Sequence, residues 1–376
     1  MKRSIAVLST AAIAAALLAG FGCNKSGSSS SSGALIGIAI PETHVTRWIK
    51  DGATLKSEAE KRGYRTEVQF ADGDQSIQNR QIQSFLTLES KLLVVGNIDE
   101  SIVPVIAEAA QKKVAVIAYD RLILGSADYD YYITFNNSKV GVLQGQSLAE
   151  ALSLDEATAK APKLIALFAG SMTDANAFAF YDGAMSVLNP YIEKGALKVI
   201  GPYAETSADR DNFSKLATAG WDGDIAKERM AALLKAEAKN VTLDAVLAPN
   251  DHIARKIIEV CKANAKYSAK LPLVCGQDAE FESSLFIKSG DQLSTIFKNT
   301  SKLAEAAIIL ADQILKGQTP DIPGAILASG PLEKLGDTGK KVVKTYLLDP
   351  ILVTKDNLNV PVEAEFYTAA ESEALK

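Results

Sequence analysis

The sequence predicts an α/β protein built from two doubly wound parallel sheets. Short, nearly continuous apolar runs rich in Val, Ile and Leu recur from residue 34 onwards, as expected for strands that are buried on both faces of a parallel sheet. Segments with helical periodicity lie between these runs, most clearly where Leu303, Ala307, Leu310 and Ile314 share one face. The 376 residues, of which 47% are hydrophobic, are enough for two domains of typical size.

Residues 1–22 have the features of a signal peptide. A positively charged start precedes an apolar stretch, which is too short for a membrane span, and small residues follow. Cys23 and the Ser/Gly tract behind it make residues 23–33 resemble the lipidated cysteine and flexible tether of a bacterial lipoprotein. The alternative is ordinary cleavage nearby that leaves Cys23 as a free thiol, because Gly20 stands where the lipoprotein motif usually has Leu.

Nine apolar runs are the expected strands, and they fit two sheets better than one. They cover residues 35–40, 66–70, 91–95, 114–118, 163–168, 197–200, 244–247, 271–275 and 292–297. Cys261 falls in a helical pattern and Cys275 ends an apolar run, so we expect both to be buried free thiols. A disulfide between them is the alternative in an oxidising compartment.

Composition and motifs exclude several functional classes. The net charge of −5 provides no basic surface for nucleic acid. Two histidines far apart, His44 and His252, do not form a zinc site of the usual spacing. The chain has no GxGxxG turn after its first strand, no Walker A sequence and no GxSxG elbow. We therefore expect neither a metal nor a cofactor.

Polar side chains follow several predicted strands, where ligands bind in open α/β sheets. The positions are Asp120 with Arg121, residues 171–174, Asn250 with Asp251, Asp278, and Lys298. The alternative is that Asp and Asn cap the helices that follow, which we expect for Asp251. Carboxylates, amides, Arg and Lys together offer donors and acceptors, which suits a polyhydroxyl ligand without net charge.

Long stretches of the chain resemble the periplasmic sugar-binding proteins of bacterial ABC importers, which have the type I periplasmic binding fold. The similarity is greatest to the D-xylose-binding and multiple-sugar-binding aldose receptors. It covers essentially everything after the tether. The resembling segments are TRWIKDG at 46–52, AYDRLI at 118–123, TFNN at 134–137, DANAF at 174–178, FYDGAMSVL at 180–188, GQDAE at 276–280 and STIFK at 294–298.

The resemblance implies two lobes joined by a three-segment hinge, with the ligand in the cleft between them. Residues 34–137 and 299–325 would form the N-terminal lobe, and residues 138–298 and 326–376 the C-terminal lobe. Asn136, at the first crossing, stands where relatives usually have Asp, which we expect to affect the hinge. Binding would shift the protein from an open to a closed form.

The resemblance also implies the roles of particular residues. Trp48 would stack on a sugar face, although it could instead anchor the first helix. Phe178 is the candidate for a second aromatic wall, since Trp221 looks like the start of a helix. Lys298 could be a solvated strand end. The residues implied to hydrogen-bond the sugar are Arg47, Asp120, Arg121, Asp174, Asn176, Asn250, Asp278 and Lys298.

The implied function is that of an exported, lipid-anchored receptor. It would bind a monosaccharide such as xylose, glucose or galactose and deliver it to a membrane permease, with a chemoreceptor as a further partner. Two alternatives stay open: a secreted sugar-processing enzyme using carboxylates such as Asp120 and Asp278, and a sugar-sensing regulator of the same fold. We expect no enzymatic turnover.

Overall fold

The computed structural model describes residues 33–45 and 47–376. The predicted signal peptide, Cys23 with its proposed lipid, and almost all of the tether lie outside the described residues. Within the described part, no helix is both long enough and apolar enough to cross a membrane.

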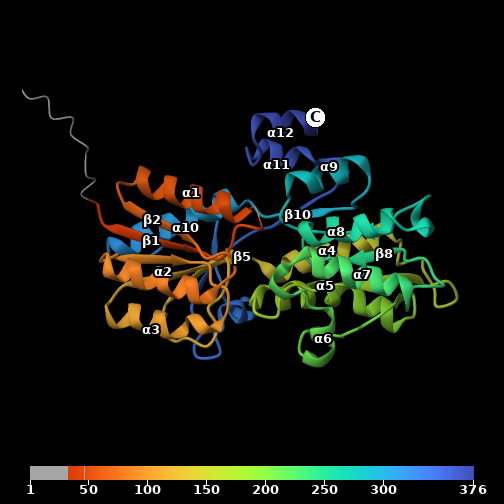
Figure 1. Ribbon diagram of the computed structural model, residues 1–376, viewed down its shortest axis with the longest axis horizontal. Helices are drawn as coiled ribbons and strands as arrows, with labels where there is room; N and C mark the ends of the chain where they lie inside the picture. The colour runs from red at the N-terminus through yellow and green to blue at the C-terminus, as the bar shows by residue number, and fades with distance from the viewer. Residues whose placement is uncertain (1–32, 46) are drawn as a thin grey trace, which may run out of the picture. The chain divides into compact units, whose positions relative to one another are not determined.

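The first lobe is built on a seven-stranded sheet with the order β11-β12-β5-β4-β3-β1-β2. Its pairs are parallel except β11–β12. Helices α1 and α10 cover one face of the sheet, and α2 and α3 cover the other (Figure 1). The elements are β1 (Leu35–Ile40), α1 (Arg47–Lys61), β2 (Arg65–Phe70), α2 (Gln75–Thr87), β3 (Leu92–Val95), α3 (Val103–Gln111), β4 (Ala115–Tyr119), β5 (Tyr131–Phe135), α10 (Thr300–Leu315), β11 (Ile326–Leu327) and β12 (Lys344–Leu348).

The first-lobe strands show why a sheet covered on both faces has continuous apolar runs. Side chains alternate between the faces of a strand. Ile38 therefore packs under α1 and α10, whereas Ala39 packs under α2 and α3. In β3, Val94 and Val95 divide in the same way.

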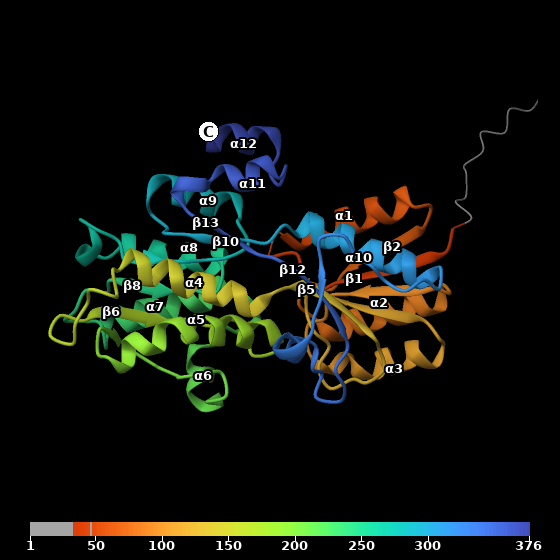
Figure 2. The ribbon, with the colours of Figure 1, turned by 180° about the vertical axis from the view of Figure 1, so that it is seen from behind.

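The second lobe contains a parallel four-stranded sheet, β7-β6-β8-β9, and an antiparallel pair, β10-β13. Figure 2 shows this lobe from behind, with α4 and α5 side by side and the C-terminal helices beyond α9. The elements are α4 (Asn137–Ala151), β6 (Lys163–Leu167), α5 (Ala175–Glu193), β7 (Leu197–Val199), α6 (Arg210–Leu216), the 3-10 turn η2 (Ala219–Trp221), α7 (Gly223–Lys235), β8 (Ala245–Leu247), α8 (Asp251–Lys262), β9 (Leu273–Val274), α9 (Phe281–Ser289), β10 (Thr295–Phe297), β13 (Ile351–Val353), α11 (Asn359–Glu363) and α12 (Ala369–Leu375).

The chain passes between the lobes three times, after β5, after β10 and after β12. Each of the first two crossings leads into a helix that begins with an asparagine cap. The side chain of Asn136 caps α4 and that of Asn299 caps α10, and each accepts a hydrogen bond from the backbone amide three residues later in the sequence. Asn136 therefore acts at a crossing as a helix cap. The amide oxygen of Asn suits this position as well as Asp would.

The assignment of residues 326–376 to the C-terminal lobe is wrong for their first part. β11 and β12 extend the first-lobe sheet, and β12 pairs in parallel with β5. The chain enters the second lobe only after Leu348, and β13 then pairs with β10. The pairing of β12 with β5, which is distant in sequence, buries Tyr346 and Leu348 against α10. This burial explains why the segment joins the first lobe although the residues that follow it lie in the second.

The fold class predicted from the sequence is confirmed, and all nine predicted runs contain strands. β5, β11, β12 and β13 were not predicted, and β10 lies outside the parallel sheet. Cys261 and Cys275 are both buried and unpaired, as expected. Burial raises the pKa of each thiol to about 12.

Candidate ligand-binding site

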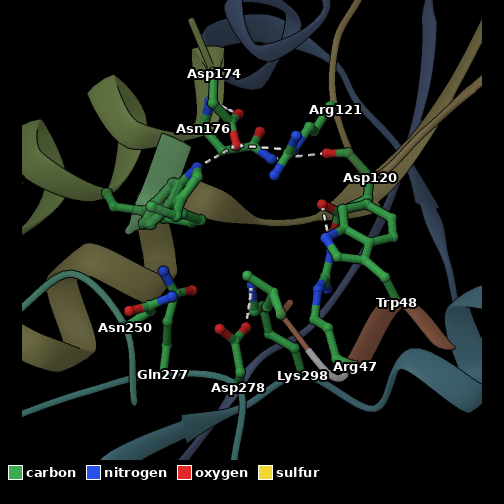
Figure 3. Close-up of a pocket in the computed structure, with 13 residues that line it drawn as sticks. Arg47, Trp48, Asp120, Arg121, Asp174, Asn176, Asn250, Gln277, Asp278 and Lys298 are labelled. Atoms are coloured by element: carbon green, nitrogen blue, oxygen red, sulfur yellow. Dashed lines mark hydrogen bonds and ion pairs between the residues drawn. The ribbon is translucent and has the colours of Figure 1, made fainter. Parts of the chain in front are cut away.

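A pocket of about 340 Å³ lies between the two lobes, beyond the carboxyl ends of strands from both sheets (Figure 3). The structure brings all nine predicted ligand-binding residues into its lining. The complete lining is Val45, Arg47, Trp48, Asp120 and Arg121 from the first lobe, and Asp174, Asn176, Phe180, Trp221, Asn250, Gln277, Asp278 and Lys298 from the second.

Arg47 and Asp120 form a buried ion pair in the first lobe. Arg47 opens α1, Asp120 follows β4, and Arg47 Nη2 lies 2.6 Å from Asp120 Oδ2. Burial alone would raise the pKa of Asp120, but Arg47, Lys298 and Arg121 outweigh it and keep that pKa below its usual value. Asp120 has a φ of 62°, in the left-handed region that Asp tolerates better than most residues. Such strain is concentrated at functional sites.

Arg121 connects the two lobes. Its Nε lies 3.2 Å from Asp174 Oδ2 in the second lobe, and its Nη2 lies 2.9 Å from Glu42 Oε1 in the first. Burial raises the pKa of Asp174, although Arg121 opposes this effect. The planar guanidinium thus holds carboxylates from both sides of the cleft, a geometry that Lys could not reproduce.

Asn176 forms a second connection between the lobes. Its Nδ2 donates to the backbone oxygen of Asp120 at 2.8 Å, and its Oδ1 accepts from Tyr132 and from Asn137 at 3.0 and 2.6 Å. Its amide oxygen is therefore occupied within the protein. The second hydrogen on Nδ2 is what this side chain has left to offer a ligand.

The second lobe contributes a buried pair at the end of β10. Lys298 Nζ lies 2.8 Å from Asp278 Oδ1, and both side chains are less than a tenth exposed. Lys298 is therefore not a solvated strand end. Asn250 caps α8 through its Oδ1 and still lines the pocket, so capping and lining coincide in one residue.

The interpretation of Asp251 as a helix cap is wrong, because Asn250 takes that position. Asp251 is fully buried, and its carboxylate accepts hydrogen bonds from Gln292, Thr295 and the backbone amide of Glu280, each at 2.9 Å. Burial raises its pKa well above the usual value. Asp251 thereby supports the loop that carries Gln277 and Asp278.

The aromatic walls differ in part from the expectation. Trp48 lines the pocket and also packs in the first-lobe core, as an anchor of the first helix would. Phe178 does not line the pocket; it packs against Phe213, with ring centroids 5.1 Å apart. Phe180 faces the pocket instead, because residues two apart lie on different sides of a helix.

The second-lobe wall is completed by Trp221, which the sequence placed at the start of a helix. It does precede α7, but its ring lines the pocket and packs edge-on against Phe180. Its Nε1 donates to Asp174 Oδ2 at 3.2 Å. The backbone φ of 59° at Trp221 orients its ring toward the pocket. No feature of the sequence predicted this backbone conformation.

Residues 36–319 match the family described as periplasmic binding protein domain. The chain belongs to this family. It is 41% identical over 340 residues to the multiple sugar-binding periplasmic protein SbpA of Azospirillum brasilense, covering 89% of this chain and 90% of the relative. It is 38% identical to the multiple sugar-binding periplasmic receptor ChvE of Rhizobium radiobacter, covering 98% and 99%.

Solved structures of the family show the same fold. An ABC transporter solute-binding protein from Clostridium phytofermentans with bound β-D-glucose has a TM-score of 0.80 and 34% identity, covering 90% of this chain and 99% of that one. A carbohydrate transporter solute-binding protein from Chloroflexus aurantiacus with D-glucose has a TM-score of 0.78 and 30% identity, covering 89% and 97%. The type I fold predicted from the sequence is thus confirmed.

The pocket of this family member is balanced in charge. Arg47, Arg121 and Lys298 face Asp120, Asp174 and Asp278. Polar atoms also remain available, since Arg47 Nη1 and Gln277 Oε1 are buried and have no hydrogen-bond partner among the described residues. Buried polar atoms are normally bonded. A ligand with many hydroxyls and no net charge would satisfy them without disturbing the balance.

Proposed function

We propose that this protein binds a neutral monosaccharide, an aldose such as xylose, glucose or galactose, in the cleft and delivers it to an ABC permease. The observation that carries the proposal is the charge-balanced set of three buried ion pairs between two aromatic walls. Charge-assisted hydrogen bonds fix the positions of hydroxyls. The apolar faces of Trp48 and Trp221 would cover the sugar ring and exclude competing water.

The relatives support this proposal. Two of them are named as multiple sugar-binding proteins, and two others as D-xylose-binding proteins. Two solved structures at 30% identity or more hold glucose. The name of ChvE as a receptor supports a chemoreceptor as a further partner.

The pocket's electrostatics favour binding over turnover. Glycoside hydrolysis needs a carboxylic acid whose pKa is raised so that it can donate a proton. Asp120 has a lowered pKa beside Arg47. Asp174 is the lining carboxyl whose pKa burial raises, and its Oδ2 is already engaged by Arg121 and by Trp221 Nε1. We therefore propose that the protein releases its sugar unchanged.

Export and lipid anchoring at Cys23 are part of the proposal. The relatives are named periplasmic, and the sequence begins with a predicted signal peptide. Cys23→Ser should release the protein from the membrane fraction and abolish labelling by a radioactive fatty acid. Membrane retention of that variant would contradict lipid anchoring.

Thermal unfolding with a panel of pentoses, hexoses and sugar acids tests the function. The protein is first unfolded, dialysed and refolded to remove any ligand from the host. A sugar at a thousand times its Kd should stabilise the fold by about 4 kcal/mol. A shift with one or a few neutral aldoses supports the proposal, whereas no shift with any sugar, or a shift with sugar acids alone, overturns it.

A further inference from the structure

The wall formed by Trp221 is held in place from several sides. Its φ of 59° is rare for a bulky residue, and its Nε1 is bonded to Asp174. The turn η2 is attached to the end of the β6 segment, since Thr218 N donates to the backbone oxygen of Gly170 at 3.2 Å. The indole ring therefore has little freedom to turn away.

Gly170 lies directly behind this ring. A Cβ placed on Gly170 would stand 2.1 Å from Cη2 of Trp221, 2.5 Å from Cζ2 and 2.6 Å from Cζ3. Gly170 is buried and does not line the pocket, whereas Trp221 does, so the ring lies between Gly170 and the ligand space. Gly170 is not among the glycines with positive φ, and its backbone accepts alanine. The three heavy atoms nearest to an added methyl group would thus all belong to the ring of Trp221.

We propose that Gly170 is a specificity-determining residue, which sets the depth of the sugar pocket and so decides whether an aldohexose fits as well as an aldopentose. This inference rests on the proposed function and deepens it. To bring the 2.1 Å contact to an ordinary 3.4 Å, the ring of Trp221 must advance into the pocket by more than 1 Å. Because the ring of Trp221 lines the pocket, this advance narrows the ligand space, and the sugar with the additional hydroxymethyl group loses room first.

D-glucose and D-xylose are the matched ligands for the test, because they differ only by the hydroxymethyl group on C5. Dissociation constants for both sugars are measured by calorimetry on the full-length wild-type protein, Gly170→Ala, Trp221→Phe and the double variant. Sterically excluding one group of this size changes relative affinity by about tenfold or more. We expect Gly170→Ala to shift the preference about tenfold toward D-xylose.

The double variant is the matched control. Phenylalanine lacks the distal benzo ring that meets the added methyl group, so the double variant should return to the preference of Trp221→Phe alone. An unchanged glucose-to-xylose ratio in folded Gly170→Ala overturns the inference. If Gly170→Ala does not fold, Trp221→Phe decides: a smaller ring should shift the ratio toward D-glucose, and an unchanged ratio overturns the inference. Wild-type protein that binds neither sugar overturns the inference, and the thermal unfolding panel with the other sugars then decides the proposed function separately.

Discussion

Replacing Asp120 by asparagine removes one carboxylate from the pocket and leaves the backbone around it intact. The backbone oxygen of Asp120 accepts hydrogen bonds from Tyr132, Thr134 and Asn176 at 2.9, 3.0 and 2.8 Å. The bond from Asn176 joins the two lobes, and all three bonds persist in Asp120→Asn. Asparagine also tolerates the φ of 62°, whereas alanine would add strain. Asn is therefore the sharper test of the carboxylate.

The magnitude follows from the loss of a charge-assisted bond. A hydrogen bond to a charged group contributes about 1.5 to 3 kcal/mol, so sugar affinity should fall by about 10- to 150-fold. The ligand-free variant should also melt at a lower temperature, because Arg47 stays buried without its 2.6 Å partner. Calorimetric titration and thermal unfolding measure the two effects separately.

An exposed carboxylate serves as the control. Asp130 pairs with Lys341 on the surface at 2.9 Å, and such pairs contribute little to stability. Asp130→Asn should bind sugar as the wild type does. If Asp120→Asn also binds with wild-type affinity, Asp120 does not contact the ligand and the site is wrongly assigned.

Three further changes test the pocket residue Lys298 and two residues of α1, Asp51 and Lys50, that lie outside the pocket lining. Lys298→Met leaves Asp278 buried without its cation, so sugar affinity should fall about tenfold or more in calorimetry; unchanged affinity would contradict this. Burial raises the pKa of Asp51 to about 6 from 3.8, so its folded form retains a proton that the unfolded form loses. The contribution of Asp51 to the free energy of unfolding, measured with urea, should thus fall by about 2 kcal/mol as pH rises from 4 to 7. Asp51→Asn should remove this contribution, and an equal slope in the variant would exclude Asp51. Lys50 Nζ on α1 lies 3.7 Å from the centre of the Phe366 ring, a contact that joins the first lobe to the C-terminal segment. If this contact favours closure of the cleft, Lys50→Ala should weaken sugar binding up to about fivefold. Unchanged sugar affinity would contradict a link between this contact and closure of the cleft.

The strands were predictable where both faces of a strand are buried. The runs at β1 and β3 are continuous because alternate side chains enter two separate cores. β5, with the sequence YYITF, and β12, with KTYLL, have fewer aliphatic residues in succession. Their pairing joins segments about two hundred residues apart, and local pattern does not report it.

The pocket residues at strand ends were predictable because carboxyl ends of parallel strands meet at one edge. Asp120 and Asp278 lie beyond the parallel strands β4 and β9, whereas Lys298 follows β10, which pairs antiparallel with β13. The second aromatic wall was not predictable in the same way. Trp221 reaches the pocket through a left-handed backbone conformation and the space above Gly170, and both are properties of the folded chain.

The role of Asp251 shows the same limit. In the sequence, Asn250 and Asp251 look like two equivalent candidates for the cap of α8. In the structure Asn250 is the cap, because its Oδ1 accepts a hydrogen bond from the backbone amide of Ile253. Asp251 turns inward to Thr295 and Glu280. Which of two neighbouring polar residues enters the core depends on partners far away in the sequence.

Calorimetric titration of the refolded wild-type protein at pH 7 with D-glucose and with D-glucuronate compares a neutral and a negatively charged ligand in this pocket. The two ligands share their ring, but glucuronate brings a fourth negative charge to a pocket that holds three carboxylates against three cations. We predict saturable binding of D-glucose and binding of D-glucuronate at least tenfold weaker, a difference of about 1.4 kcal/mol. Equal or tighter binding of glucuronate would contradict the claim that this pocket is built for a neutral sugar.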